Sequence, residues 1–270
     1  MRSIAFMYLF LIVALMTGCF DDSDDSSSLP ADAPPITEDQ SAAGIYPAIA
    51  NNFVSENVDR PGQSRVDAII ASTGEARFML FGSSSIPLLY THLTGNVNVE
   101  ADRFTAPLKT YSTDSDGNTQ ISLATLDGTV KTKDGIWGNY TWGQDFGRFV
   151  LNYVSLYEEP SMLCLLEGIW TFSQASSSGA VFTFTLSIDP DGTVFGSHTA
   201  GCVYNGTFGI IDTRYNVYRL SLDASLCGEL DGSYEGLATL SETQPQRSLM
   251  FGTSNEEHSL SGIVFSSLQP

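Results

Sequence analysis

Two cysteines, Cys202 and Cys227, are spaced so that their thiols could form a disulfide bond. Between them lie two runs typical of β-strands, 203–211 and 216–222, separated by a polar cluster that favours a turn. In a hairpin centred midway between the cysteines, their Cβ atoms would lie opposite each other, about 4.5–5.5 Å apart. A modest adjustment reaches disulfide geometry, and an oxidising compartment would preserve the bond. We therefore expect a Cys202–Cys227 disulfide.

Metal and redox chemistry are not indicated by these residue types. Zinc sites need ligands at close spacing, such as C-x-x-C or H-x-x-x-H, and the chain has neither. His92, His198 and His258 are isolated in the sequence. We predict no metal site, no cofactor and no catalytic residue. Cys164, in the apolar stretch SMLCLLEG, is expected to be a buried free thiol.

An aromatic cluster, GIWGNYTW, is the candidate binding patch. It contains Trp137, Tyr140 and Trp142, and strand alternation would place Tyr140 and Trp142 on one face. Such side chains could line a barrel cavity or an outer recognition surface. Ordinary barrel packing is the alternative. Because the second half of the chain is less aromatic at the corresponding stretch, a ligand site confined to one half is expected in the first.

The elements that position these residues are predicted to be β-strands throughout. Short runs rich in Val, Ile, Phe, Tyr and Thr alternate with Gly, Asn, Asp and Ser clusters, and no stretch after residue 40 has a sustained helical period. The segments 71–74 and 189–192 each end in a glycine suited to a hairpin turn. The signals repeat in order along the chain, and 135–140 and 231–236 look like matched positions. We predict an all-β chain with two consecutive antiparallel, calycin-like barrel domains, 41–160 and 161–270; a β-sandwich is the alternative.

The amino terminus predicts export. Residues 4–16 form an apolar run that is too short to span a bilayer as a helix and fits a secretory signal. The end of this run and the next three residues, Met16-Thr17-Gly18-Cys19, resemble the lipobox of bacterial lipoproteins. The resemblance implies cleavage of the signal peptide 1–18 and lipidation of Cys19. Residues 20–40 carry seven acidic and no basic residues, so 19–40 is predicted to be a disordered tether.

The net charge of the chain limits the classes of partner that it can bind. The formal net charge of −19 disfavours nucleic acid and anionic lipid heads. With its lipobox, acidic tether and Gly-rich strand sets, the chain resembles bacterial lipoproteins that carry small eight-stranded barrels, such as factor H-binding and transferrin-binding lipoproteins. We predict a lipid-anchored envelope protein that binds an envelope or exogenous macromolecule without catalysis. The absence of Asp directly after Cys19 favours the outer membrane. An inhibitor of a toxic enzyme and a periplasmic enzyme are the alternatives, and a small-molecule ligand is left open.

Overall fold

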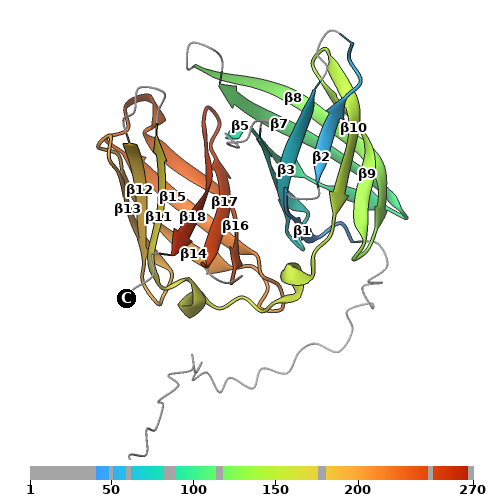
Figure 1. Ribbon diagram of the computed structural model, residues 1–270. Helices are drawn as coiled ribbons and strands as arrows, with labels where there is room; N and C mark the ends of the chain where they lie inside the picture. The colour runs from blue at the N-terminus through green and yellow to red at the C-terminus, as the bar shows by residue number, and fades with distance from the viewer. Residues whose placement is uncertain are drawn as a thin grey trace, which may run out of the picture. The chain divides into compact units, whose positions relative to one another are not determined.

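The structure is a computed structural model that describes residues 41–48, 51–58, 62–81, 89–113, 118–175, 181–242 and 246–266. All of them belong to one compact unit, Ile36–Pro270. The predicted signal peptide, the tether and Cys19 lie outside the described residues. The described chain consists of strands β1–β18 and three short 3-10 helices, η2 (Ser155–Glu158), η3 (Leu163–Leu166) and η4 (Gly228–Leu230) (Figure 1).

The first barrel is built from ten strand segments. They are β1 (Gly44–Tyr46), β2 (Asn52–Ser55), β3 (Gln63–Ile70), β4 (Glu75–Phe81), β5 (Leu89–Asn96), β6 (Asn98–Glu100), β7 (Arg103–Thr113), β8 (Thr119–Lys131), β9 (Gly135–Trp142) and β10 (Asp145–Asn152). β1 and β2 pair with successive stretches of β3, so together they occupy one position in the wall. β5 and β6 likewise both pair with β7. Eight wall positions result, and the ring closes because β2 pairs with β10 and β3 with β4.

The second barrel contains eight strands in simple up-and-down order. They are β11 (Gly168–Ala175), β12 (Val181–Ile188), β13 (Thr193–His198), β14 (Val203–Ile210), β15 (Tyr218–Ser225), β16 (Gly232–Ser241), β17 (Ser248–Ser254) and β18 (Ser259–Ser266). The ring closes because β11 pairs with β18, at Trp170–Ser266 and Thr171–Phe265 among the described residues. The all-β prediction with two consecutive antiparallel barrels is confirmed, and the sandwich alternative is wrong. β10 ends at Asn152 and β11 begins at Gly168, on either side of the predicted limit at 160.

Each barrel has its own hydrophobic core, because alternate side chains of every strand point inward. In β7, for example, Phe104, Ala106 and Leu108 are buried while Pro107 is exposed. The largest core side chains of the first barrel are Tyr46, Phe53, Phe78, Phe104, Tyr140 and Phe149. Those of the second barrel are Trp170, Tyr204, Phe208, Tyr218, Tyr234 and Phe251.

The hairpin turns predicted at 71–74 and 189–192 are confirmed and have the same geometry. The amide of Gly74 donates to the Ala71 carbonyl, and the amide of Gly192 donates to the Asp189 carbonyl, each at 2.9 Å. Both glycines have φ of 86°, which glycine adopts at little cost. Each turn joins the second and third wall positions of its barrel. The predicted match of 135–140 with 231–236 is wrong by one strand, because β9 is the seventh wall position and β16 the sixth.

A third hydrophobic cluster takes side chains from both barrels. Its buried members are Ile45, Ile69, Ala71, Met79, Phe81, Tyr157, Val217, Leu237 and Met250. Buried polar groups lie on the same outer side of β4 and β5, where Arg77 pairs with Glu75 at 2.7 Å and donates to the Glu235 carbonyl at 3.3 Å. Burial, reinforced by the charge of Arg77, lowers the pKa of His92 to about 3. The imidazole is therefore neutral at neutral pH.

Candidate functional site

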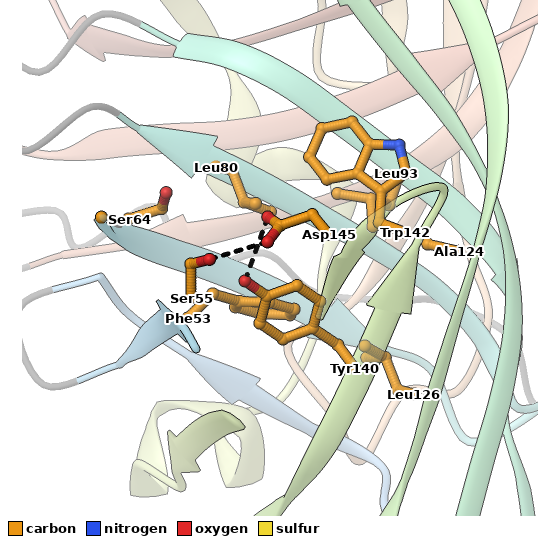
Figure 2. Close-up of a pocket in the computed structure, with 11 residues that line it drawn as sticks. Phe53, Ser55, Ser64, Leu80, Leu93, Ala124, Leu126, Tyr140, Trp142 and Asp145 are labelled. Carbon is orange, nitrogen blue, oxygen red and sulfur yellow. Dashed lines mark hydrogen bonds between the residues drawn. The ribbon is translucent and has the colours of Figure 1, made fainter. Parts of the chain in front are cut away.

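The first barrel contains a partly open cavity of about 180 Å³ next to the turn that joins β9 to β10. Figure 2 shows that the lining side chains come from strands on several sides of the barrel. They are Phe53, Ser55, Gly62, Ser64, Leu80, Leu93, Ala124, Leu126, Tyr140, Trp142 and Asp145. Most of the wall is apolar, and the hydroxyl and carboxylate groups belong to Ser55, Ser64, Tyr140 and Asp145. The cavity therefore has an apolar body and a polar edge.

Strand alternation brings Tyr140 and Trp142 into this cavity. Tyr140 is buried, and Thr141, the residue between the two aromatics, is exposed on the outer wall. Gly147 lies opposite Tyr140 in the β9–β10 pair. A Cβ atom at Gly147 would collide with the Val54 carbonyl oxygen and the Tyr140 ring. The missing side chain at Gly147 thus makes room for the tyrosine.

Asp145 is the one charged residue among the eleven that line the cavity. It is the first residue of β10 and pairs with Trp142. Its Oδ1 accepts hydrogen bonds from the Ser55 hydroxyl at 2.7 Å and from the Phe146 amide at 2.9 Å. Its Oδ2 accepts one from the Tyr140 hydroxyl at 3.3 Å, and Figure 2 shows both hydroxyl contacts. These bonds tie β2, β9 and β10 together at the edge of the cavity.

Hydrogen bonds and burial fix the state and orientation of the two aromatic side chains that β9 contributes to the cavity, Tyr140 and Trp142. Burial, reinforced by the nearby acidic residues, raises the pKa of Tyr140 to about 12. The phenol is therefore a neutral hydrogen-bond donor at neutral pH. The indole Nε1 of Trp142 donates to the Ser122 hydroxyl at 2.6 Å, and Ser122 in turn lies 2.6 Å from the Thr110 hydroxyl. These contacts orient the indole toward β8 and β7.

The predicted binding patch is divided between the two faces of β9. Tyr140 and Trp142 line the cavity, as the alternation predicted for that pair. Trp137 points the other way, and 43% of it is exposed on the outer wall. It lies beside Val150, its partner in the β9–β10 pair, and Phe146 is also exposed on β10. The three predicted residues therefore do not form one site.

Sequence reasoning missed Asp145 and Ser55. Asp145 could have been predicted from the sequence, because a two-residue turn at 143–144 pairs it directly with Trp142. Ser55 left no such signal. It reaches the carboxylate only because the barrel closes by pairing β2 with β10, strands about 90 residues apart in the chain.

A second recess of about 220 Å³ lies at the opposite end of the β3–β4 hairpin. It is lined mainly by small side chains and by the 71–74 turn, and its lining contains no charged residue. Within the described residues, no group of three or more His, Cys, Asp and Glu side chains is placed to hold a metal ion. The cavity edged by Asp145 is therefore the better candidate site.

The cysteine predictions have mixed outcomes. Cys202 and Cys227 lie at disulfide distance, with their Cα atoms 4.6 Å apart, at the open end of the β14–β15 hairpin. That pairing is confirmed. Cys164 is half-buried and no described cysteine is free, so the expectation of a buried free thiol is wrong. Cys19, the predicted lipidation site, lies outside the described residues.

The chain matches no protein-family model, and no curated protein or solved structure is significantly similar to it. Among the described segments, no helix combines the length and the apolar character needed to cross a bilayer. Arguments about function therefore rest on the geometry of the cavity and on the sequence.

Proposed function

We propose that this chain is a lipid-anchored binding protein of the bacterial cell envelope, at the outer membrane, and that its first barrel holds a small amphipathic ligand. In this role the protein binds its partners and catalyses no reaction. The observation that carries the ligand site is a cavity whose apolar wall ends in a single carboxylate. A macromolecular partner would meet the outer wall at Trp137, Phe146 and Val150, where large apolar side chains are exposed.

The size of the cavity limits the ligand. Apolar cavities of about 150 Å³ in proteins take up benzene, and this one has about 180 Å³. Larger drug-like molecules need cavities of about 300 Å³ or more. We therefore expect a ligand with one ring or a short alkyl chain in the cavity. In the second barrel, Trp170, Tyr218 and Tyr234 are fully buried in the core.

Tryptophan fluorescence should report this binding, because Trp142 lines the cavity. Titration of the full-length protein with single-ring amphiphiles of different charge is expected to give a saturable signal for at least one of them. Ala124→Leu should abolish the signal because the added side chain fills the cavity. Leu123→Ala is the matched control, because Leu123 precedes Ala124 in β8 and is 76% exposed. No saturable signal with any probe, or equal binding by the Ala124→Leu protein, would contradict the ligand site.

The anchor is tested separately. Cells that express the wild-type protein and are labelled with palmitate are expected to yield a labelled protein that partitions into detergent. Cys19→Ser should lose both properties because the serine hydroxyl cannot form the thioether. Recovery of the Cys19 peptide in a disulfide, without lipid, would refute the anchor.

A further inference from the structure

We propose that the cavity of the first barrel selects cationic amphiphiles, specifically a primary ammonium group carried by one ring or a short alkyl chain. This inference rests on the proposed function and names the class of ligand that the site takes. It is carried by the charge at the cavity edge, by the partners of that charge and by the aromatic side chains around it.

The carboxylate of Asp145 has no cationic partner among the described residues. Its three hydrogen-bond donors, the Ser55 hydroxyl, the Tyr140 hydroxyl and the Phe146 amide, are all neutral. The described ion pairs do not include it. Arg148, on the same strand, is exposed and pairs with Glu56. Within the described residues no cation balances this negative charge, and a cationic ligand would do so.

A ligand that covers this edge would remove water from the carboxylate. Such desolvation is costly unless a charge of opposite sign replaces the lost water. An ammonium group supplies that charge and three hydrogen-bond donors, and hydrogen bonds between charged groups are the stronger kind. A neutral ligand offers less compensation, and an anionic ligand would add repulsion. The edge of the cavity thus discriminates by charge.

Aromatic faces near the carboxylate favour the same ligand. Phe53, Tyr140 and Trp142 all line the cavity, and the rings of Phe53 and Tyr140 lie 5.1 Å apart between centroids. Ammonium groups are attracted to the faces of such rings. The indole nitrogen of Trp142 is already bonded to Ser122, so the side chain is held in place.

The rest of the cavity wall suits an apolar group at the end of the ligand away from the ammonium. Leu80, Leu93, Ala124 and Leu126 provide apolar surface and no polar side-chain atom. A ring or short alkyl chain would lie against them while the ammonium group reaches Asp145. The formal net charge of −19 further raises the local concentration of cations around the protein.

Three single-ring probes of similar size but different charge test the proposal on the full-length protein by titration calorimetry. They are 2-phenylethylamine, 2-phenylethanol and 3-phenylpropanoate. The ammonium probe is expected to bind at least about tenfold more tightly than the alcohol, and the carboxylate is expected to bind most weakly. Asp145→Asn should remove the preference for the ammonium probe over the alcohol. Asp127→Asn changes the net charge equally at an exposed position paired with Arg103, so the preference should persist.

The outcomes separate this inference from the proposed function. Equal affinity of the wild-type protein for the ammonium and the alcohol would overturn the inference and leave a ligand site in place. Failure of all three probes to bind would overturn both the charge selection and the proposed small-ligand site. If Asp145→Asn does not fold, salt provides the second measurement on the wild-type protein. Raising the ionic strength is expected to weaken binding of the ammonium probe and not of the alcohol, and an equal response of both probes would refute the selection by charge.

Discussion

Replacement of Trp170 by alanine is expected to lower the free energy of unfolding by about 4 kcal/mol. Trp170 is fully buried in the second barrel. Its indole Nε1 donates to the Leu166 carbonyl at 2.8 Å, and the Arg247 guanidinium lies 5.3 Å from the ring centroid. The substitution would leave a large cavity and an unpaired buried carbonyl, and both effects destabilise a folded protein.

Urea denaturation followed by circular dichroism measures this loss without relying on tryptophan emission. Trp137→Ala is the matched control, because Trp137 also follows a Gly-Ile pair near the start of a strand but is 43% exposed. Its expected cost is below about 1 kcal/mol, as is usual for substitutions at the surface. Equal losses for the two variants would contradict the strand registers in one of the barrels.

These two tryptophans also show how far the sequence could specify the fold. Gly-Ile-Trp occurs at 135–137 and at 168–170. In β9 the isoleucine is buried and the tryptophan is exposed, whereas in β11 the isoleucine is exposed and the tryptophan is buried. Local composition predicts a strand at both places. The alternation of side chains along a strand predicts that the isoleucine and the tryptophan lie on opposite faces. Which face points inward depends on pairing with distant strands, because a shift of one residue exchanges the two faces.

Removal of the Cys202–Cys227 bond by a double Cys→Ala substitution is expected to cost about 3 kcal/mol of unfolding free energy. The bond spans a sequence separation of 25. Breaking it restores conformational freedom to the unfolded chain, which is the main effect of a disulfide in the chain-entropy model. Thermal and urea unfolding of the double variant, compared with the wild-type protein, measure the difference.

A reducing agent provides the control for this substitution. Under reducing conditions the wild-type protein should approach the stability of the double variant, and the double variant itself should change less. A double variant as stable as the oxidised wild-type protein would show that the bond does not constrain the unfolded chain.

Only part of the candidate site could be predicted from the sequence. Tyr140 and Trp142 were found because they are aromatic and two residues apart on one strand. The polar half of the site was not, because the bond from Ser55 to Asp145 exists only when the first and last wall positions of the barrel meet. Residues brought together by closure of a barrel carry no local pattern that would mark them as a pair.

The way in which the second barrel closes has a consequence for the order of folding. Among the described residues, β11 and β18 pair at Trp170–Ser266 and Thr171–Phe265, and β11 pairs with β12 along its whole length. Neighbouring hairpins can form early because their strands are close in the chain, but the first and last strands must close a loop of nearly the whole domain. We therefore expect the contact between β11 and β18 to form late on the folding pathway and to open early when the native barrel fluctuates.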